Sequence, residues 1–341
     1  MVKILVTGGC GYIGSHTLVD LLDHGYTPVS VDNLSNSRET VLQGVQEITG
    51  KTVQNYPLDL CNPESLSRIF SEHPDIEGVI HFAALKAVGE SVEQPLRYYR
   101  NNLLGLLNLI EGMSVAGVRN LIFSSSCSVY GNAQELPVTE NTPRQEAESP
   151  YARTKQMGED ILSDFTHAFP GFNAVLLRYF NPAGAHESGR IGEDPRNQAN
   201  NLVPVITETA AGKRSGMTVF GNDYPTRDGS CIRDYIHVMD LAHAHTKALE
   251  YLLAYRNQDP CEIFNLGIGE GVTVLEAIQA FEQVAQTRLN YTIGPRRPGD
   301  VVAIYANLDK AARVLGWTPK RNIRDIMQTA WEWEKKRSEM Q

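Results

Sequence analysis

The sequence has few cysteines, no long hydrophobic run and no excess of basic residues. Its five cysteines are scattered, odd in number and without a C-x-x-C pair: Cys10, Cys61, Cys127, Cys231 and Cys261. They argue against a disulfide framework and indicate free thiols in a reducing compartment, so we expect a cytoplasmic protein. Acidic residues outnumber basic residues by 40 to 31, which gives a formal net charge of −9. This balance disfavours general binding to nucleic acid or to an anionic membrane.

Targeting segments, repeats and metal motifs are also missing. No apolar stretch reaches the length of a transmembrane helix, and the opening MVKILVTGGC lacks the plan of a signal peptide. His243 and His245 stand two apart in a predicted helix and do not share a face, so we expect no metal site. The 341 residues are 42% hydrophobic, without low-complexity segments or a polar linker. This composition is typical of a globular chain that forms one large domain or two ordinary ones.

The N-terminal segment carries the strongest local signal. Residues 2–6 form a short apolar run that predicts a strand buried on both faces of a parallel sheet. Gly8, Gly11 and Gly14 follow it, and apolar residues at helical spacing come next. A glycine-rich turn between a strand and a helix can hold a pyrophosphate on bare backbone N–H groups. The spacing here is G-x-x-G-x-x-G, so the turn alone does not decide between a ligand site and a plain turn.

Later strands supply the rest of a dinucleotide site. Residues 27–32 predict a second strand that ends in Asp32, whose carboxylate would bind ribose hydroxyls and favour NAD over NADP. Further strands are predicted in QNYPLDLCN, which contains Asp59, and at 77–84, 119–131 and 174–184, with helical patterns between them. Strands that alternate with helices indicate an α/β fold, a Rossmann-type doubly wound parallel sheet with ligands at the carboxyl ends of its strands.

A tyrosine and a lysine lie four residues apart in SPYARTK. Ser149 and Pro150 predict a helix start, and a buried stripe is expected at Met157, Ile161, Leu162 and Phe165. Tyr151 and Lys155 then project side by side, and the ammonium is expected to lower the tyrosine pKa. Taken alone, the pair is better explained as two ordinary residues on a solvated helix face, because a chain with 14 tyrosines often contains this pattern by chance. Ser124, Ser125 and Ser126 at the end of the fifth strand favour a catalytic group, because all of these side chains would meet beside a nicotinamide.

The longer motifs resemble one family. They are TGGCGYIGSH, DNLSNS, HFAALKAVGESV, SSSCSVYG, SPYARTK, LRYFNPAGAH, NNL at 200–202, FGNDYPT, RDYIHV and RRPGD. From residue 2 to about residue 335 the chain is similar to the UDP-glucose 4-epimerase (UDP-galactose 4-epimerase) family of extended short-chain dehydrogenases/reductases. The resemblance implies tightly bound NAD, a UDP-sugar substrate, a 4-keto intermediate and a homodimer.

The resemblance also implies roles for individual residues. Tyr151 would be the acid–base, Lys155 would lower its pKa and bind the nicotinamide ribose, and Ser126 would bind the sugar 4-oxygen. Cofactor contacts are expected, besides Tyr151 and Lys155, at Gly8, Gly11, Tyr12, Ile13, Gly14, Asp32, Asn33, Asn36, Ser37, Asp59, Leu60, Phe82, Ala83, Ala84, Lys86, Asn101, Ser124 and Phe180. Substrate contacts are expected, besides Ser126 and Tyr151, at Lys86, Asn181, Asn201, Leu202, Thr218, Val219, Phe220, Arg233, Tyr235, Arg297, Asp300 and Ile304.

Residues 1–180 are expected to form the NAD-binding domain, with a later segment near 235–255 packing back onto it. Residues 181–341 would mainly form a smaller α/β domain that binds the UDP-sugar. Ile304 stands where the family varies beside the sugar, so weaker activity on 2-acetamido sugars is expected.

Other functions stay open within the same fold. Dehydratases carry Asp and Glu after the hydroxyl residue of strand five, whereas this chain has Cys127 and Ser128, which disfavours elimination of water. A uronic-acid 4-epimerase differs only in its contact to C6. A plain NAD dehydrogenase would consume added NAD, and a sensor protein would not need Ser126, Tyr151 and Lys155 together.

Overall fold

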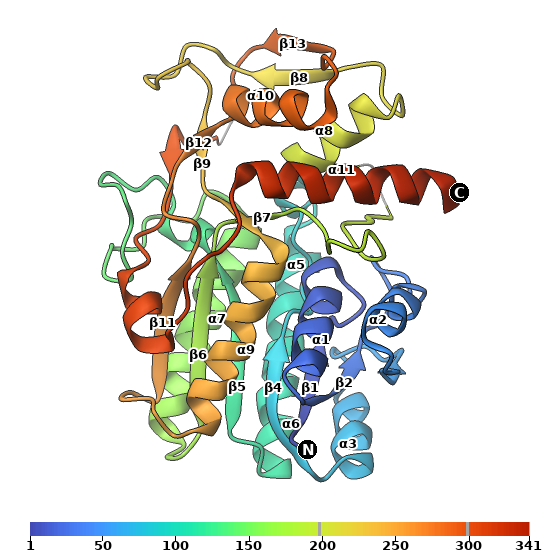
Figure 1. Ribbon diagram of the computed structural model, residues 1–341. Helices are drawn as coiled ribbons and strands as arrows, with labels where there is room; N and C mark the ends of the chain where they lie inside the picture. The colour runs from blue at the N-terminus through green and yellow to red at the C-terminus, as the bar shows by residue number, and fades with distance from the viewer. Residues whose placement is uncertain (197–198, 298–299, 341) are drawn as a thin grey trace.

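A seven-stranded parallel sheet forms the centre of the molecule. The computed structural model describes residues 1–196, 199–297 and 300–340 (Figure 1). The sheet has the order β11-β6-β5-β4-β1-β2-β3. Its strands are β1 Lys3–Thr7, β2 Thr27–Val31, β3 Asn55–Tyr56, β4 Ile76–His81, β5 Asn120–Ser126, β6 Asn173–Tyr179 and β11 Cys261–Leu266. The strand order reverses between β1 and β4, which opens a crevice at their carboxyl ends.

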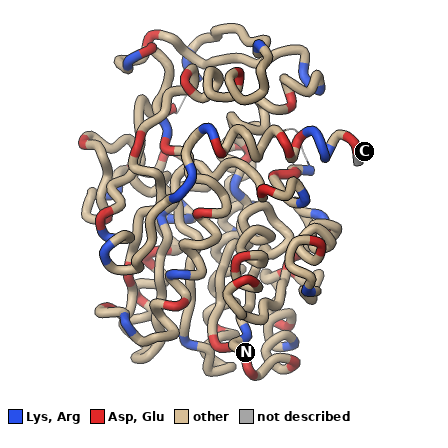
Figure 2. Tube along the Cα trace, viewed as in Figure 1, with Lys and Arg blue, Asp and Glu red and all other residues tan. Residues whose placement is uncertain are grey.

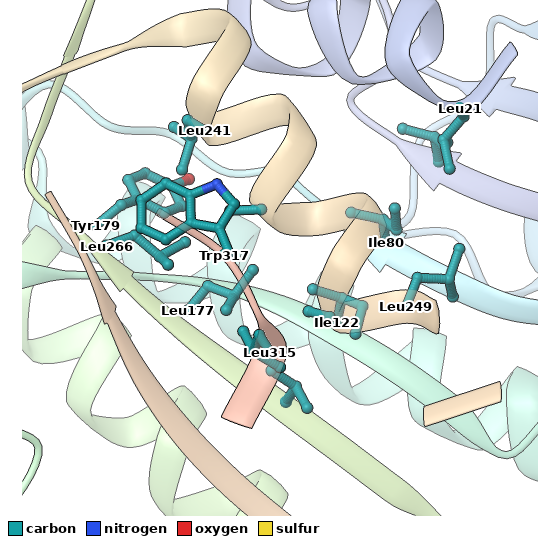
Figure 3. Packing of buried hydrophobic residues seen from close by; sticks show 14 of the residues in the cluster. Leu21, Ile80, Ile122, Leu177, Tyr179, Leu241, Leu249, Leu266, Leu315 and Trp317 are labelled. Atoms are coloured by element: carbon teal, nitrogen blue, oxygen red, sulfur yellow. The ribbon is translucent and has the colours of Figure 1, made fainter. Parts of the chain in front are cut away.

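Helices cover both faces of this sheet because its strands are apolar on both sides. One face carries α1 Tyr12–Asp23, α2 Val41–Thr49 and α9 Val238–Leu253, and the other carries α3 Pro63–Glu72, α6 Gly105–Ala116 and α7 Pro150–Ala168. Figure 3 shows part of the first core, where Trp317 lies with Leu177, Leu241 and Leu266. The Trp317 indole N–H donates to the Asp240 carbonyl oxygen at 3.0 Å. The predicted doubly wound sheet is confirmed.

A smaller set of elements lies over the carboxyl ends of the sheet strands (Figure 1). Three small sheets pair β7 Asn181–Ala183 with β10 Tyr235–His237, β8 Met217–Phe220 with β13 Tyr291–Gly294, and β9 Ile232–Arg233 with both β12 Val272–Thr273 and β14 Ala303–Ile304. Helices α8 Leu202–Ala210, α10 Val274–Ala285 and α11 Ile323–Met340 pack around a third core.

Short helical segments complete the chain. They are α4 Val88–Glu93, α5 Pro95–Tyr99, the π-helix η1 Arg100–Leu104, the 3₁₀-helix η2 Cys127–Tyr130 and the π-helix η3 Ala311–Leu315. Acidic and basic side chains are interspersed along the chain (Figure 2). In the described residues, no helix is both long and apolar enough to cross a membrane.

The chain returns to the large sheet after it has built the smaller part. Helix α9 packs on the sheet face beside α1, and β11 adds an edge strand next to β6. No strand was expected at β11 from the sequence. In α7, Leu162 is buried as predicted, but Met157 is 38% exposed, so the buried stripe is narrower than expected.

Candidate active site

The glycine-rich turn joins β1 to α1 at the switch point of the sheet. Gly8 has φ of +72°, and a side-chain carbon on Gly14 would lie 2.2 Å from the Gly8 carbonyl oxygen. A larger residue at position 14 would therefore push the helix start away from the strand. Among the described residues, the N–H groups of Tyr12 and Ile13 have no acceptor. A short cradle of free donors at a helix N-terminus fits a pyrophosphate.

Asp32 follows β2 and organises the next loop. Its carboxylate accepts hydrogen bonds from the Cys10 N–H at 3.1 Å, the Leu34 N–H at 2.9 Å and the Ser37 hydroxyl at 2.8 Å. The Asn33 amide donates to Asp59 Oδ2 at 3.3 Å. The structure thus brings together the residues expected on the adenosine side. Asn36 is exposed beside them, whereas the Leu60 side chain is buried in the core.

The end of β4 forms the opposite wall of the crevice. Phe82, Ala83 and Ala84 are partly exposed there, and the Ala83 N–H donates to the Thr7 hydroxyl at 3.2 Å. Asn101, in the π-helix η1, donates to Asn102 Oδ1 at 2.9 Å. Single-turn π-segments are frequent at functional sites.

Asn102 is a buried connector that sequence reasoning missed. Its Oδ1 accepts the Leu85 N–H at 2.8 Å, and its Nδ2 donates to the Thr154 hydroxyl at 3.1 Å. The loop after β4 is thereby fixed to α7, one residue before Lys155. The signal in the sequence was the pair of asparagines at 101–102, of which only the first was chosen.

Tyr151 and Lys155 lie on the first turns of α7, facing the end of β5. The Ser149 hydroxyl caps this helix by accepting the Ala152 N–H at 3.2 Å. Lys155 is buried, and its Nζ donates to the Ser124 carbonyl oxygen at 2.5 Å. The same Nζ lies 5.9 Å from the centre of the Tyr151 ring. Ser126, the last residue of β5, lies close enough to Tyr151 for its hydroxyl to lower the tyrosine pKa. The predicted group is therefore assembled at the carboxyl edge of the sheet.

The protonation of this pair differs from the expectation. Burial raises the pKa of Tyr151 to about 12, although the Ser126 hydrogen bond opposes this rise. Burial lowers the pKa of Lys155 to about 8, and the charge of Glu159 opposes that fall. The expected lowering of the tyrosine pKa was wrong for the protein alone, because burial is the largest cause of the shift and the Lys155 ammonium is directed at the Ser124 carbonyl.

Glu159 lies one helical turn beyond Lys155 and was not predicted. It accepts the Ser125 hydroxyl at 2.5 Å and two hydrogen bonds from Arg178 of β6, at 2.8 and 2.6 Å. All three side chains are buried. The i, i+4 spacing from Lys155 was visible in the sequence, but its contacts with β5 and β6 were not. This ion pair fixes α7 against the strands that carry the serines.

Glu193 connects two residues that were predicted to bind the substrate. Its Oε1 accepts from Lys86 Nζ at 3.3 Å and from the Asn201 amide at 2.9 Å. Asn201 precedes α8, and Leu202 begins this helix. Glu193 itself was missed, because no motif or periodic pattern marks it. An acidic group is thus held between the loop after β4 and the N-terminus of α8.

Two predicted arginines converge on Asp300. The Asp300 carboxylate accepts from Arg297 at 2.7 and 3.1 Å and from Arg233 at 3.4 Å. The Arg297 guanidinium also lies over the Phe220 ring, 5.6 Å from its centre. Pro298 and Gly299 of the same motif lie outside the described residues. Two guanidinium groups beside an aromatic ring suit a nucleoside diphosphate.

The other predicted substrate residues divide into open and buried positions. Thr218 is exposed beside Phe220, and Asn181 is partly exposed and donates its backbone N–H to the Asp234 carbonyl oxygen at 2.9 Å. The side chains of Val219 and Tyr235 are buried in the third core. Phe180 and Ile304 are packed together in a small cluster with Cys127.

Comparison with known proteins places the chain in a family. A family model described as GDP-mannose 4,6 dehydratase matches residues 5–330. The UDP-glucose 4-epimerase of Bacillus subtilis is 51% identical over 331 residues, which are 97% of this chain and 96% of that protein. This chain belongs to the UDP-glucose 4-epimerase family.

Solved structures of the epimerase family share the whole fold. UDP-glucose 4-epimerase from Bifidobacterium longum, in complex with NAD+ and UDP, is 45% identical with a TM-score of 0.95 over 99% of both chains. The enzyme from Stenotrophomonas maltophila, with bound NAD and formylated UDP-arabinopyranose, is 42% identical with a TM-score of 0.96 over 100% of both chains.

The two residues after Ser126 in this chain do not suit the dehydratase reaction that the description of the matching family model names. Burial raises the pKa of the Cys127 thiol to about 12, with the charge of Arg233 opposing this rise. Ser128 offers a hydroxyl that has no partner among the described residues. Neither group can serve as the carboxylic acid that elimination of water requires. The raised thiol pKa also argues against a reactive thiolate at Cys127.

Proposed function

We propose that this protein interconverts UDP-galactose and UDP-glucose by inverting C4 of the sugar, with NAD as a retained cofactor. The meeting of Ser126, Tyr151 and Lys155 beside the glycine-rich turn is the observation that carries this proposal. The turn with free N–H donors and the Asp32 carboxylate fit NAD, and relatives with the same fold bind NAD. When bound, NAD supplies the acceptor and donor of the C4 hydride.

The side chains of the protein handle the proton and the sugar oxygen. Tyr151 takes the proton from the 4-hydroxyl and later returns it on the other face of the turned sugar. Its raised pKa makes the phenolate costly, so the nearby Lys155 ammonium is needed to favour it. Ser126, which lies near Tyr151, binds the 4-oxygen and relays the proton. Lys155 is held in place by the Ser124 carbonyl.

The substrate must be held by its nucleotide while its sugar turns. Arg233 and Arg297 would exchange contacts with Asp300 for contacts with diphosphate oxygens, which accept paired hydrogen bonds from guanidinium groups. Asn201 would place the N-terminus of α8 near the phosphates, with Lys86 on the opposite side. Ile304 limits the room beside the sugar, so the 2-acetamido sugars would be poorer substrates. We assign residues 1–180 with the segment near 235–255 to the cofactor and the rest of 181–341 mainly to the UDP-sugar.

A homodimer in the cytoplasm is part of the same proposal. The helices α4, α5, η1 and α7 contact one another, and α6 continues from η1. They carry large apolar side chains that are 38 to 76% exposed: Val88, Val92, Leu96, Leu104, Leu107 and Met157. A patch of this kind is typical of an interface between subunits, and a second copy of the chain would cover it.

The test is NMR of the sugar anomeric signals after purified protein is mixed with UDP-galactose and no NAD. We expect a mixture of both UDP-hexoses, and a loss of rate of at least about 100-fold in Tyr151→Phe with UDP binding unchanged. If added NAD is required and NADH accumulates, the protein is a dehydrogenase. If UDP-hexoses are inert and UDP-uronic acids epimerise, the fold and the cofactor assignment stand but the substrate is different.

A further inference from the structure

A carboxylate and two imidazoles meet between α1 and α9, on the sheet face opposite α7. Asp20 and His24 lie in the last turn of α1 and at its C-cap, and His243 lies in α9. The Nδ1 atom of His24 is 3.3 Å from Asp20 Oδ2, and the Nδ1 atom of His243 is 3.4 Å from the same carboxylate. The two helices lie side by side, as Figure 1 shows. Residues 223 positions apart are thus joined around one carboxylate.

The geometry of this cluster suits a metal ion. One donor atom from each of the three residues can be chosen so that all lie within 4.8 Å of one another. A tetrahedral Zn²⁺ ion with bonds of about 2.0–2.2 Å holds its ligand atoms about 3.3 Å apart. The Nδ1 atom of His243 lies 3.4 Å from the Asp20 carboxylate, which is close to that spacing. The two rings are near each other as well, with centres 5.0 Å apart.

The aspartate of this cluster is buried, whereas the two imidazoles are partly exposed to solvent. The Asp20 side chain is 10% exposed, whereas His24 and His243 are 33% and 26% exposed. The Nδ1 atom of His24 also lies 2.7 Å from the Asp20 carbonyl oxygen. Coordination through its Nε2 atom would keep that bond, which is the usual arrangement for a ligating imidazole. An ion can therefore reach the site from solvent and find ligands fixed on two helices.

We propose that Asp20, His24 and His243 bind one divalent transition-metal ion of the Zn²⁺ class. Two imidazole nitrogens and a carboxylate oxygen form a donor set that such ions prefer, and water completes the coordination. The ion would connect the end of α1 to α9. It would therefore join the N-terminal, cofactor-binding part of the chain to a helix that follows the first substrate-binding segments in the sequence. The proposal is independent of the proposed reaction, because none of the three residues belongs to the candidate active site.

The alternative is a hydrogen-bonded cluster without an ion, and calorimetry distinguishes the two. Tag-free protein with its cofactor, dialysed against EDTA and then against buffer, would be titrated with ZnCl₂. We expect about one Zn²⁺ per chain and a higher melting temperature, because a ligand of the folded state alone stabilises it. In His243→Gln and Asp20→Asn the affinity should fall at least about 10-fold, and the rise in melting temperature should disappear.

His167→Gln is the matched control. His167 makes the same kind of contact as His24, from Nδ1 to the carbonyl oxygen four residues earlier, at 2.6 Å, but it lies outside the cluster. This variant should bind Zn²⁺ like the unchanged protein, and the sugar-nucleotide activity of all three variants should be unchanged. Zinc-edge anomalous scattering from a crystal would locate the ion. The proposal is overturned if stoichiometric binding is absent, if it persists in His243→Gln, or if the ion lies elsewhere.

Discussion

At the scale of single residues, Lys155 is charged only within a limited pH range. Burial brings its pKa down to about 8, so the ammonium is present below that pH and is lost above it. Because turnover needs the Tyr151 phenolate, whose pKa is about 12, together with the Lys155 ammonium, the rate should rise with pH by up to about tenfold per pH unit below pH 8 and level off above it. Lys155→Arg keeps its charge throughout this range. We expect a slower enzyme whose rate keeps rising between pH 8 and 10.

The shape of the pH profile identifies the group. Ionisation of Tyr151 alone would make the rate rise throughout this range, whereas loss of the Lys155 proton cancels that rise above pH 8. Rates would be measured by NMR from pH 6 to 10, and a return to pH 7 would check that no enzyme had unfolded. The same levelling of the rate above pH 8 in both proteins would show that Lys155 does not act through its charge.

At the scale of elements, Glu159 holds α7 to β5 and β6. Glu159→Gln leaves the buried Arg178 guanidinium without a countercharge, and breaking a buried pair in this way costs about 3–5 kcal/mol of unfolding free energy. Glu332→Gln removes an exposed pair with Lys335 on α11 and should cost less than about 1 kcal/mol. Urea unfolding of both variants would measure the difference. Equal costs would mean that the buried pair does not support the helix.

The same elements show which features the sequence could and could not predict. The strand β1, the turn and α1 follow from adjacent residues, as does the cap of α7 at Ser149, so local patterns predict them. Strand β11 joins the sheet only through its pairing with β6, and no local pattern specifies that partner. The prediction that the pKa of Tyr151 is lowered was wrong for a similar reason. The lysine four residues away is a local feature of the sequence, whereas burial of the tyrosine depends on the whole fold.

At the scale of the molecule, the candidate site is assembled from contacts between distant parts of the chain. Lys86 and Glu193 are 107 residues apart, and Arg233 and Asp300 are 67 residues apart. Lys86, Arg233 and Asp300 were predicted from the sequence because each lies in one of the family's motifs. Glu193 stands in none, and only its position between Lys86 and Asn201 reveals it. The motifs therefore predicted several of the residues that meet at the site. The acidic group among them could be found only from the three-dimensional structure.

The exposed apolar patch over α4 to α7 makes a prediction about assembly. Leu107, near the start of α6, is 39% exposed within the patch, whereas Val115, near the end of the same helix, is 92% exposed. A charge at Leu107 would be buried without a partner in a dimer but solvated in a monomer. We expect sedimentation to give twice the 37.8 kDa chain mass for the unchanged protein and for Val115→Arg, and the monomer mass for Leu107→Arg. Because Leu107 already contacts solvent in the single chain, Leu107→Arg should keep the circular dichroism spectrum of the folded state. A dimer that persists in this variant would place the interface on another face.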